Sequence, residues 1–176
     1  MTELMYKGTV CITARHKKYR YNNAGSTKLF NLLINFLCGA YVNSFDKSVL
    51  PGKIGIFKMS KNDLLNSSSN SKQISNLKDY ITIDYGTKTG TTPYVQYNFI
   101  IEARDIIDKN IQTTDPISLG LISANKQDVL AAIDLTDIEG ENNTSIINAV
   151  LAGNTSVVIN WKLCFVNSTS NKEDTE

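Results

Sequence analysis

The sequence predicts a mainly β fold, in which antiparallel strands form a β-sandwich of the jelly-roll type and one amphipathic helix packs on it. Two observations carry this prediction. Short segments with alternating apolar and polar residues recur along the chain, with turns rich in Gly, Pro and Asn between them, which is the pattern of a sandwich. Residues 26–39 instead repeat their apolar side chains every three or four positions, as one face of a helix does.

The chain of 176 residues is long enough for one domain with a buried core. We expect residues 1–166 to form this domain and the polar residues 167–176 to be a flexible tail. The net charge of +1 creates no field that would attract nucleic acid or a membrane surface. The N-terminus lacks the apolar segment of a secretion signal, and no apolar run is long enough to span a bilayer.

The first part of the chain predicts a strand, a basic connection and a turn. Residues 6–14 alternate between an apolar and a more polar face, which indicates a half-buried strand. The basic and aromatic residues 15–21 follow this strand. The sequence Asn-Asn-Ala-Gly at residues 22–25 then predicts a turn that leads into the helix.

The predicted helix at residues 26–39 is the element around which we expect the sheet to be arranged. Ser26 is a suitable N-cap, and Gly39 stands where the helix would end. Its apolar surface is wide, so we expect the helix to cover one open face or end of the sheet. A charge at Leu33, on this surface, would then be buried without a partner and would destabilise the fold.

The segment after the helix predicts one strand and one exposed loop. Residues 53–59 follow a Pro-Gly turn and alternate, which indicates a short strand. Residues 60–75 are rich in Ser and Asn and predict an exposed, mobile loop. Leu64 and Leu65 are the residues that could anchor this loop to the core.

The second half of the chain predicts two hairpins. Residues 77–85 and 94–103 have matching apolar positions on either side of a Gly-rich turn, which is typical of antiparallel partners. Residues 116–124 and 128–135 form a similar pair around a tight turn.

The C-terminal part predicts one strand and leaves one segment undecided. The period of residues 145–152 fits a short helix as well as a strand. Residues 155–166 are β-branched, aromatic and alternating, and they are the strongest strand signal in the chain.

The residues indicate no enzyme, cofactor or metal site. His16 is the single histidine, and four cationic residues surround it, so we interpret it as a solvated loop residue. The sequence contains no GxSxG, P-loop or GxGxxG motif in a strand-turn-helix context. The three cysteines form no CxxC pair, which is typical of free thiols in a reducing compartment.

The basic run is the sharpest local feature, and it has three interpretations. It could grip phosphates and stack on bases, bind an acidic patch on a protein partner, or be a charged edge strand that resists unwanted pairing. The last two are equally supported, whereas nucleic acid is not expected because the net charge is near zero. The candidate interface residues of this run are Arg15, His16, Lys17, Lys18, Tyr19 and Arg20.

An acidic cluster follows the second hairpin. It consists of Asp134, Asp137, Glu139 and Glu141 around a glycine. A Ca²⁺ site needs several oxygen ligands from a constrained loop, but the cluster lacks the EF-hand pattern, and a solvated acidic loop explains it better. Asp137, Glu139 and Glu141 are also candidate interface residues, because they could complement the basic run on a neighbouring copy in a head-to-tail contact.

Four tyrosines on the first hairpin support an alternative function. If Tyr80, Tyr85, Tyr94 and Tyr97 were exposed together, their rings could form a stacking platform of a carbohydrate- or ligand-binding β-sandwich module. Burial of the rings between sheets would argue against this module.

The order of elements resembles that of small bacteriophage virion proteins over residues 6–166. Residues 22–39, NNAGSTKLFNLLINFLCG, resemble their opening of asparagine, a small residue and glycine followed by an amphipathic helix. Residues 97–106, YNFIIEARDI, and 117–135, ISLGLISANKQDVLAAIDL, are similar to their hairpin region, and residues 155–166 resemble their closing strand. The asparagine- and isoleucine-rich composition resembles that of phages of AT-rich gut bacteria, including crAss-like phages.

This resemblance implies a non-enzymatic structural protein of the virion, made in the host cytoplasm. It would assemble in multiple copies as a ring or array in the tail, neck, collar or capsid of the phage. Its partners would be copies of itself and other virion proteins such as portal, tail or capsid components, with no membrane partner. The resemblance implies no catalytic residues and no cofactor.

Overall fold

The computed structural model describes residues 4–37, 46–67, 72–86, 94–112, 114–136, 144–151 and 156–167. Within these ranges nine antiparallel strands form one sheet in the order β4-β3-β7-β8-β2-β1-β9-β6-β5. The strands are β1 (Leu4–Ala14), β2 (Lys17–Gly25), β3 (Pro51–Phe57), β4 (Lys78–Asp79), β5 (Thr82–Gly86), β6 (Tyr94–Ile101), β7 (Ser118–Ser123), β8 (Val129–Asp134) and β9 (Val157–Asn167). The helices are α1 (Thr27–Leu37), α2 (Lys61–Leu65) and α3 (Thr144–Leu151), with single 3₁₀ turns at Lys47–Val49 and Ala103–Asp105.

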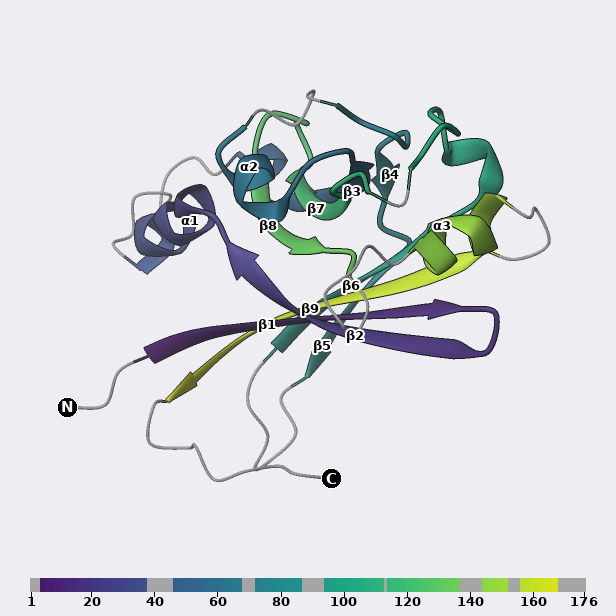
Figure 1. The fold of residues 1–176 in the computed structure, drawn as a ribbon. Coiled ribbons are helices and arrows are strands. Elements are labelled where there is room, and N and C mark those ends of the chain that lie inside the picture. Colours follow the sequence, from purple (N-terminus) through teal and green to yellow (C-terminus); the bar gives the residue numbers. More distant parts are fainter. Residues whose placement is uncertain are drawn as a thin grey trace.

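The sheet curls so far that its two edge strands, β4 and β5, follow each other directly in the sequence. β4 pairs with β3 at one edge, and β5, which follows directly in the sequence, pairs with β6 at the other. Between them the Ile81 N–H donates to the Asn98 carbonyl at 2.7 Å. In Figure 1, β3, β7 and β8 lie above the long strands β1, β2 and β9. The prediction of a mainly β fold is therefore confirmed, whereas a jelly-roll arrangement is not.

The main core lies on the inner face of this curled sheet. β9 is the central strand of the lower part, between β1 and β6, and its side chains alternate as predicted. Val157, Ile159, Trp161 and Leu163 are buried on its inner side. Trp161 and Phe99 of the neighbouring β6 are both 0% exposed, so the two strands bring the largest aromatic side chains to the centre of the core.

The upper part of the sheet is buried on both faces because α2 covers its outer side. Every residue of β7 is buried, and a second apolar cluster lies under α2. Leu64 of α2 is 0% exposed, and Leu65 packs beside it. These two residues anchor the segment as the sequence predicts, although the segment contains a short helix with Ser60 as its N-cap.

Helix α1 begins where predicted but buries a narrower face than predicted. The Ser26 hydroxyl accepts a hydrogen bond from the Leu29 N–H at 3.2 Å, which confirms the N-cap. Leu29 and Leu32 are buried, Leu33 is only half-buried, and Ile34 is 54% exposed. The buried face of α1 is narrow because the helix lies at the side of the sheet near β8 rather than across its face (Figure 1). Residue 39, where the helix was expected to end, lies outside the described residues.

The turn predicted at residues 22–25 is wrong. These residues continue β2, and the reversal of the chain occurs earlier, at Arg15 and His16. Both turn residues have positive φ angles, 51° and 61°, as required by the two-residue turns whose twist matches a hairpin. The asparagines that suggested a turn are accommodated in the strand because Asn23 lies opposite Gly8.

The later elements agree with the sequence in most respects. β5 pairs with β6 and β7 pairs with β8, so both predicted hairpins are confirmed. The first predicted hairpin strand is split into β4 and β5, because the chain crosses there from one edge of the sheet to the other. The undecided segment forms helix α3. Residues 87–93, which include most of the first hairpin's turn, and the tail beyond residue 167 lie outside the described residues.

The burial of α1 predicts different costs for two of its apolar residues. Leu29→Ala should lower the free energy of unfolding by about 2–5 kcal/mol, because it leaves a cavity beside the core. Ile34→Ala, on the exposed side of the same helix, is the matched control and should change it by less than about 0.5 kcal/mol. Urea unfolding followed by the fluorescence of the single tryptophan, Trp161, measures both. Equal losses would contradict this placement of the helix.

Candidate functional site

The hairpin of β1 and β2 carries all the candidate residues of the basic run. Arg15 and His16 form its turn, and Lys17, Lys18 and Arg20 are exposed on the first half of β2. Tyr19 is half-buried and packs against the core, with its hydroxyl 3.1 Å from the Ser145 hydroxyl of α3. The structure therefore gathers the basic run at one end of the hairpin (Figure 1).

The basic side chains do not share one face of the sheet. Residues directly opposite each other in an antiparallel pair point to the same face. Lys18 lies opposite Thr13, and Arg20 lies opposite Cys11, so both project from the outer face. Tyr19 lies opposite the buried Ile12 and projects inward. Lys18 and Arg20 are consequently the pair that a partner could meet together on the outer face.

The turn also fixes which backbone groups of β2 point away from β1. A two-residue turn closes with a hydrogen bond between its flanking residues, here Ala14 and Lys17. Because such pairs alternate along an antiparallel ladder, the N–H and C=O groups of Lys18, Arg20 and Asn22 point outward. The pairing with β8 agrees, since the N–H of Ser26, in the same series, donates to the Leu130 carbonyl at 2.8 Å.

These outward groups form an open edge. β8 pairs with β2 only at Ala24 and Gly25. No other strand in the described part of the chain pairs with residues 17–23 on the side away from β1. We call residues 17–23 the β2 edge. Within the described ranges, its backbone groups that point away from β1 have no strand partner and lie beside exposed basic side chains, which is the arrangement that an added strand could bind.

The acidic half of the candidate interface cannot be placed beside the basic half. Asp137, Glu139 and Glu141 lie outside the described residues. Asp134, at the end of β8, accepts a hydrogen bond from the Lys61 N–H at 2.7 Å and so ties β8 to the start of α2. The proposed complementarity and the possible cation site therefore both stay predictions.

A buried polar contact that the sequence did not reveal holds the other end of the hairpin. The Asn23 side chain fills the space over Gly8, where a Cβ atom would lie only 2.0–2.4 Å from the atoms of the Asn23 amide group. With its amide nitrogen toward the Tyr6 hydroxyl, the Asn23 Oδ1 accepts hydrogen bonds from the Thr9 N–H at 3.2 Å and the Trp161 indole N–H at 3.0 Å. Burial raises the pKa of the Tyr6 hydroxyl well above its ordinary value. Spacing could not predict this contact, because it depends on the register of β1 and β2.

An apolar groove lies between α1 and the strands β1, β6 and β9. Its volume is about 260 Å³, below the range of about 300–1,000 Å³ that is typical of drug-sized ligand pockets. The Phe30 and Tyr6 rings meet edge to face there, with centroids 5.6 Å apart. The lining residues are Tyr6, Leu29, Leu33, Tyr94, Val95, Leu163 and Cys164.

The cysteine in this groove is not arranged as a nucleophile. Cys164 is a free thiol, and its S–H donates to the Lys7 carbonyl at 2.8 Å. Burial raises the pKa of this thiol, which disfavours the reactive thiolate. Cys11 is also free, and Cys38 lies outside the described residues.

The four tyrosines do not form one exposed platform. Tyr97 is only 7% exposed, and its ring meets the Tyr80 ring edge to face with centroids 5.7 Å apart. Tyr85 is 75% exposed and lies opposite Val95, on the same face as Tyr97. Tyr94 alternates to the other face, where the Lys162 ammonium lies 4.1 Å from its ring centroid. Base or sugar stacking on all four rings is therefore not possible in this arrangement.

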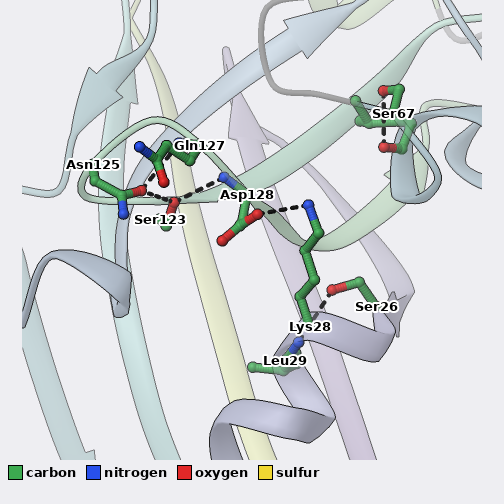
Figure 2. A network of polar contacts seen from close by, with 9 residues as sticks. Ser26, Lys28, Leu29, Ser67, Ser123, Asn125, Gln127 and Asp128 are labelled. Carbon is green, nitrogen blue, oxygen red and sulfur yellow. Dashed lines mark hydrogen bonds and ion pairs between the residues drawn. The ribbon is translucent and has the colours of Figure 1, made fainter. Parts of the chain in front are cut away.

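A polar network at the start of α1 has a structural role. Figure 2 shows Lys28 of α1 reaching Asp128, in the turn between β7 and β8, at 2.6 Å. The Ser123 hydroxyl accepts a hydrogen bond from the Asp128 N–H and donates one to the Asn125 Oδ1, which also accepts from the Gln127 N–H. This network orders the turn and joins it to the helix.

Searches for other site chemistry and for relatives gave no functional assignment. Among the described residues, no group of three or more His, Cys, Asp or Glu side chains could hold a metal ion. No helix in the described ranges is long and apolar enough to cross a membrane. No protein-family model matches the sequence, and searches of curated proteins and of solved structures found no significant match.

The burial of Tyr97 predicts a loss of stability at alkaline pH. Burial raises the pKa of Tyr97 to about 12, while a tyrosine in the unfolded chain ionises near pH 10. The unfolded state therefore loses this proton first, and stability should fall as the pH rises from about 10 to about 12. Tyr97→Phe should reduce this fall, measured as the urea midpoint against pH. Tyr85→Phe, which removes an exposed hydroxyl, is the control, and an equal effect of both substitutions would contradict the assignment.

Proposed function

We propose that this protein is a non-enzymatic structural component that works in multiple copies, joined to one another as a ring or array. The observation that carries the proposal is the β2 edge. It leaves seven residues of a strand, 17–23, with pairing to β1 on one side only among the described strands. An edge of this length is a template for pairing with another chain, and a strand of typical length is about 5–6 residues.

The basic side chains on this edge support a specific partner. Exposed lysines can protect an edge from unwanted pairing, and they can also select an acidic partner by charge complementarity. The two roles have opposite consequences. If the charges only protect the edge, removing them should increase association; if they select a partner, reversing them should abolish it.

The virion setting of this assembly rests on the resemblance to small bacteriophage virion proteins. The mainly β fold is compatible with that setting. We propose that the ring or array belongs to the tail, neck or capsid of a phage particle. Its further partners would be portal, tail or capsid proteins.

A ligand-binding module is the second candidate, and the apolar groove beside α1 is the observation that favours it. The groove has mostly apolar walls, and the exposed Phe30 packs against one of its lining residues, Tyr6. The tyrosine platform no longer supports this candidate, because the four rings are divided between two faces. A protein that binds an apolar ligand in this groove has no need of copies of itself, so the oligomeric state separates the two functions.

The proposal predicts that the purified full-length protein forms a closed ring or an ordered array. Sedimentation velocity over a range of about 1–100 µM should show a mass that rises above that of one chain, since association follows mass action. Electron microscopy of the same samples should show rings or arrays of uniform diameter. A protein that stays strictly monomeric over this range would contradict the proposal and favour the ligand-binding module.

A further inference from the structure

Resting on the proposed assembly, we propose that the β2 edge of one copy pairs with the acidic segment 137–141 of a second copy. The added strand would run antiparallel to β2 and extend the sheet beyond β8. Each copy would then use its basic edge toward one neighbour and its acidic segment toward another. Such a head-to-tail contact generates a ring or an open array.

The spacing of the charges matches a strand pairing. Asp137, Glu139 and Glu141 are separated by two positions, so in an extended strand they point to one face. Lys18 and Arg20 are also separated by two positions, and both project from the outer face of β2. Directly opposite residues of paired strands lie close enough for their charges to attract. One register therefore brings carboxylates against both cations.

The backbone of the β2 edge is directed to receive this strand. The N–H and C=O groups of Lys18, Arg20 and Asn22 continue the series that bonds β8 at Ala24 and Ser26. The added strand would lie in line with β8, where β8 leaves β2. Main-chain hydrogen bonds would supply the pairing, and the charges would supply the selectivity.

The charges disfavour the symmetric alternative, in which two β2 edges pair with each other. In a two-fold contact, residue i of one copy meets residue j of the other, and j meets i. With the two-fold axis at Tyr19, Lys18 of each copy would lie opposite Arg20 of the other, and like charges in opposed positions repel. The edge is suited to a strand of opposite charge.

The register of β8 disfavours the same pairing within one chain. β8 meets β2 with Ala132 opposite Ala24. Continued along β2, this register would place Asp137 opposite Tyr19, whose side chain packs against the core. The carboxylates would then point to the inner face, away from Lys18 and Arg20. A strand from a second copy can adopt the register that the charges favour.

The direct test is titration of the full-length protein with a synthetic peptide of residues 134–143. The control peptide carries Asn at position 137 and Gln at positions 139 and 141. We expect the acidic peptide to bind and the control to bind about tenfold more weakly, with a smaller difference at high salt. Absence of binding by the acidic peptide, or equal binding by both peptides, would overturn the inference whether or not the protein assembles.

Matched protein variants test where the peptide binds. Lys18→Glu combined with Arg20→Glu should weaken binding of the acidic peptide by about tenfold or more. Lys47→Glu combined with Lys109→Glu makes the same change in net charge at exposed sites elsewhere and should leave binding unchanged. Circular dichroism checks that both variants are folded. If both pairs of substitutions weaken binding equally, only net charge is recognised and the β2 edge is not the site.

A proline substitution separates pairing of the backbone from attraction of the charge. Arg20→Ala removes the side-chain charge, whereas Arg20→Pro also removes an N–H that points away from β1. Proline is tolerated on an edge strand at such a position, so the hairpin should fold in both variants. Peptide binding should be weaker with Arg20→Pro than with Arg20→Ala. Equal binding would show that no strand is added to the edge.

Exchange of charges between copies tests the head-to-tail arrangement. Lys18→Glu with Arg20→Glu should prevent assembly, and so should Asp137→Lys with Glu139→Lys in a second preparation. A mixture of the two should assemble again, because each reversed surface meets its reversed partner. If the mixture stays unassembled while the wild-type protein assembles, the copies are joined elsewhere; the proposed assembly then stands and this contact is wrong.

Discussion

The register of the β1–β2 hairpin is the constraint on which the rest of the structure depends. The two-residue turn at Arg15 and His16 sets it, and the contact of Asn23 with Gly8 fits this register alone, because a side chain at position 8 would occupy the space of the amide. Asn23 in turn satisfies the indole N–H of the fully buried Trp161. A slip of one residue would exchange the two faces of β2 and would leave these buried polar groups without partners.

The same register connects the hairpin to the rest of the fold. It directs the N–H of Ser26 to β8, and Ser26 also caps α1. The start of α1 is joined to the turn after β7 through Lys28 and Asp128. The hairpin register also points the backbone N–H and C=O groups of Lys18, Arg20 and Asn22 away from β1. It places the side chains of Lys18 and Arg20 on one face of the sheet. The core, the helix position and the candidate interface are therefore three consequences of one pairing.

The sequence predicted those elements whose signals are local. The alternation of β9, the N-cap of α1 and the two hairpins all depend on neighbours in the chain, and the structure contains each of them. The end of β2 was not predictable in this way. Asn22 and Asn23 have the composition of a turn, and only the glycine opposite Asn23 explains why a strand can hold them. Arg15 and His16 are not typical turn residues, and the pairing of long flanking strands places them there.

The candidate site was predictable in composition and not in geometry. The basic run is visible in the sequence as a cluster of cations with tyrosines, and the structure gathers it at one end of the β1–β2 hairpin. The run is divided between two faces of the sheet, because Lys18 and Arg20 project from the outer face and Tyr19 projects from the inner face. Only the register of β1 and β2 reveals this division. The tyrosine platform failed for the same reason, since strand pairing places Tyr94 and Tyr97 on opposite faces. The exposure of Ile34 could not be predicted without knowing where α1 lies relative to the sheet.

Amide hydrogen exchange, measured residue by residue by NMR, tests the central claim that the outward side of β2 is open and accepts an acidic strand. In protein diluted until the copies separate, we predict fast exchange at residues 18, 20 and 22 and protection at residues 19, 21 and 23. Addition of the acidic peptide should protect the first set and leave the second unchanged. Protection of both sets before the peptide is added, or no added protection with it, would contradict the claim.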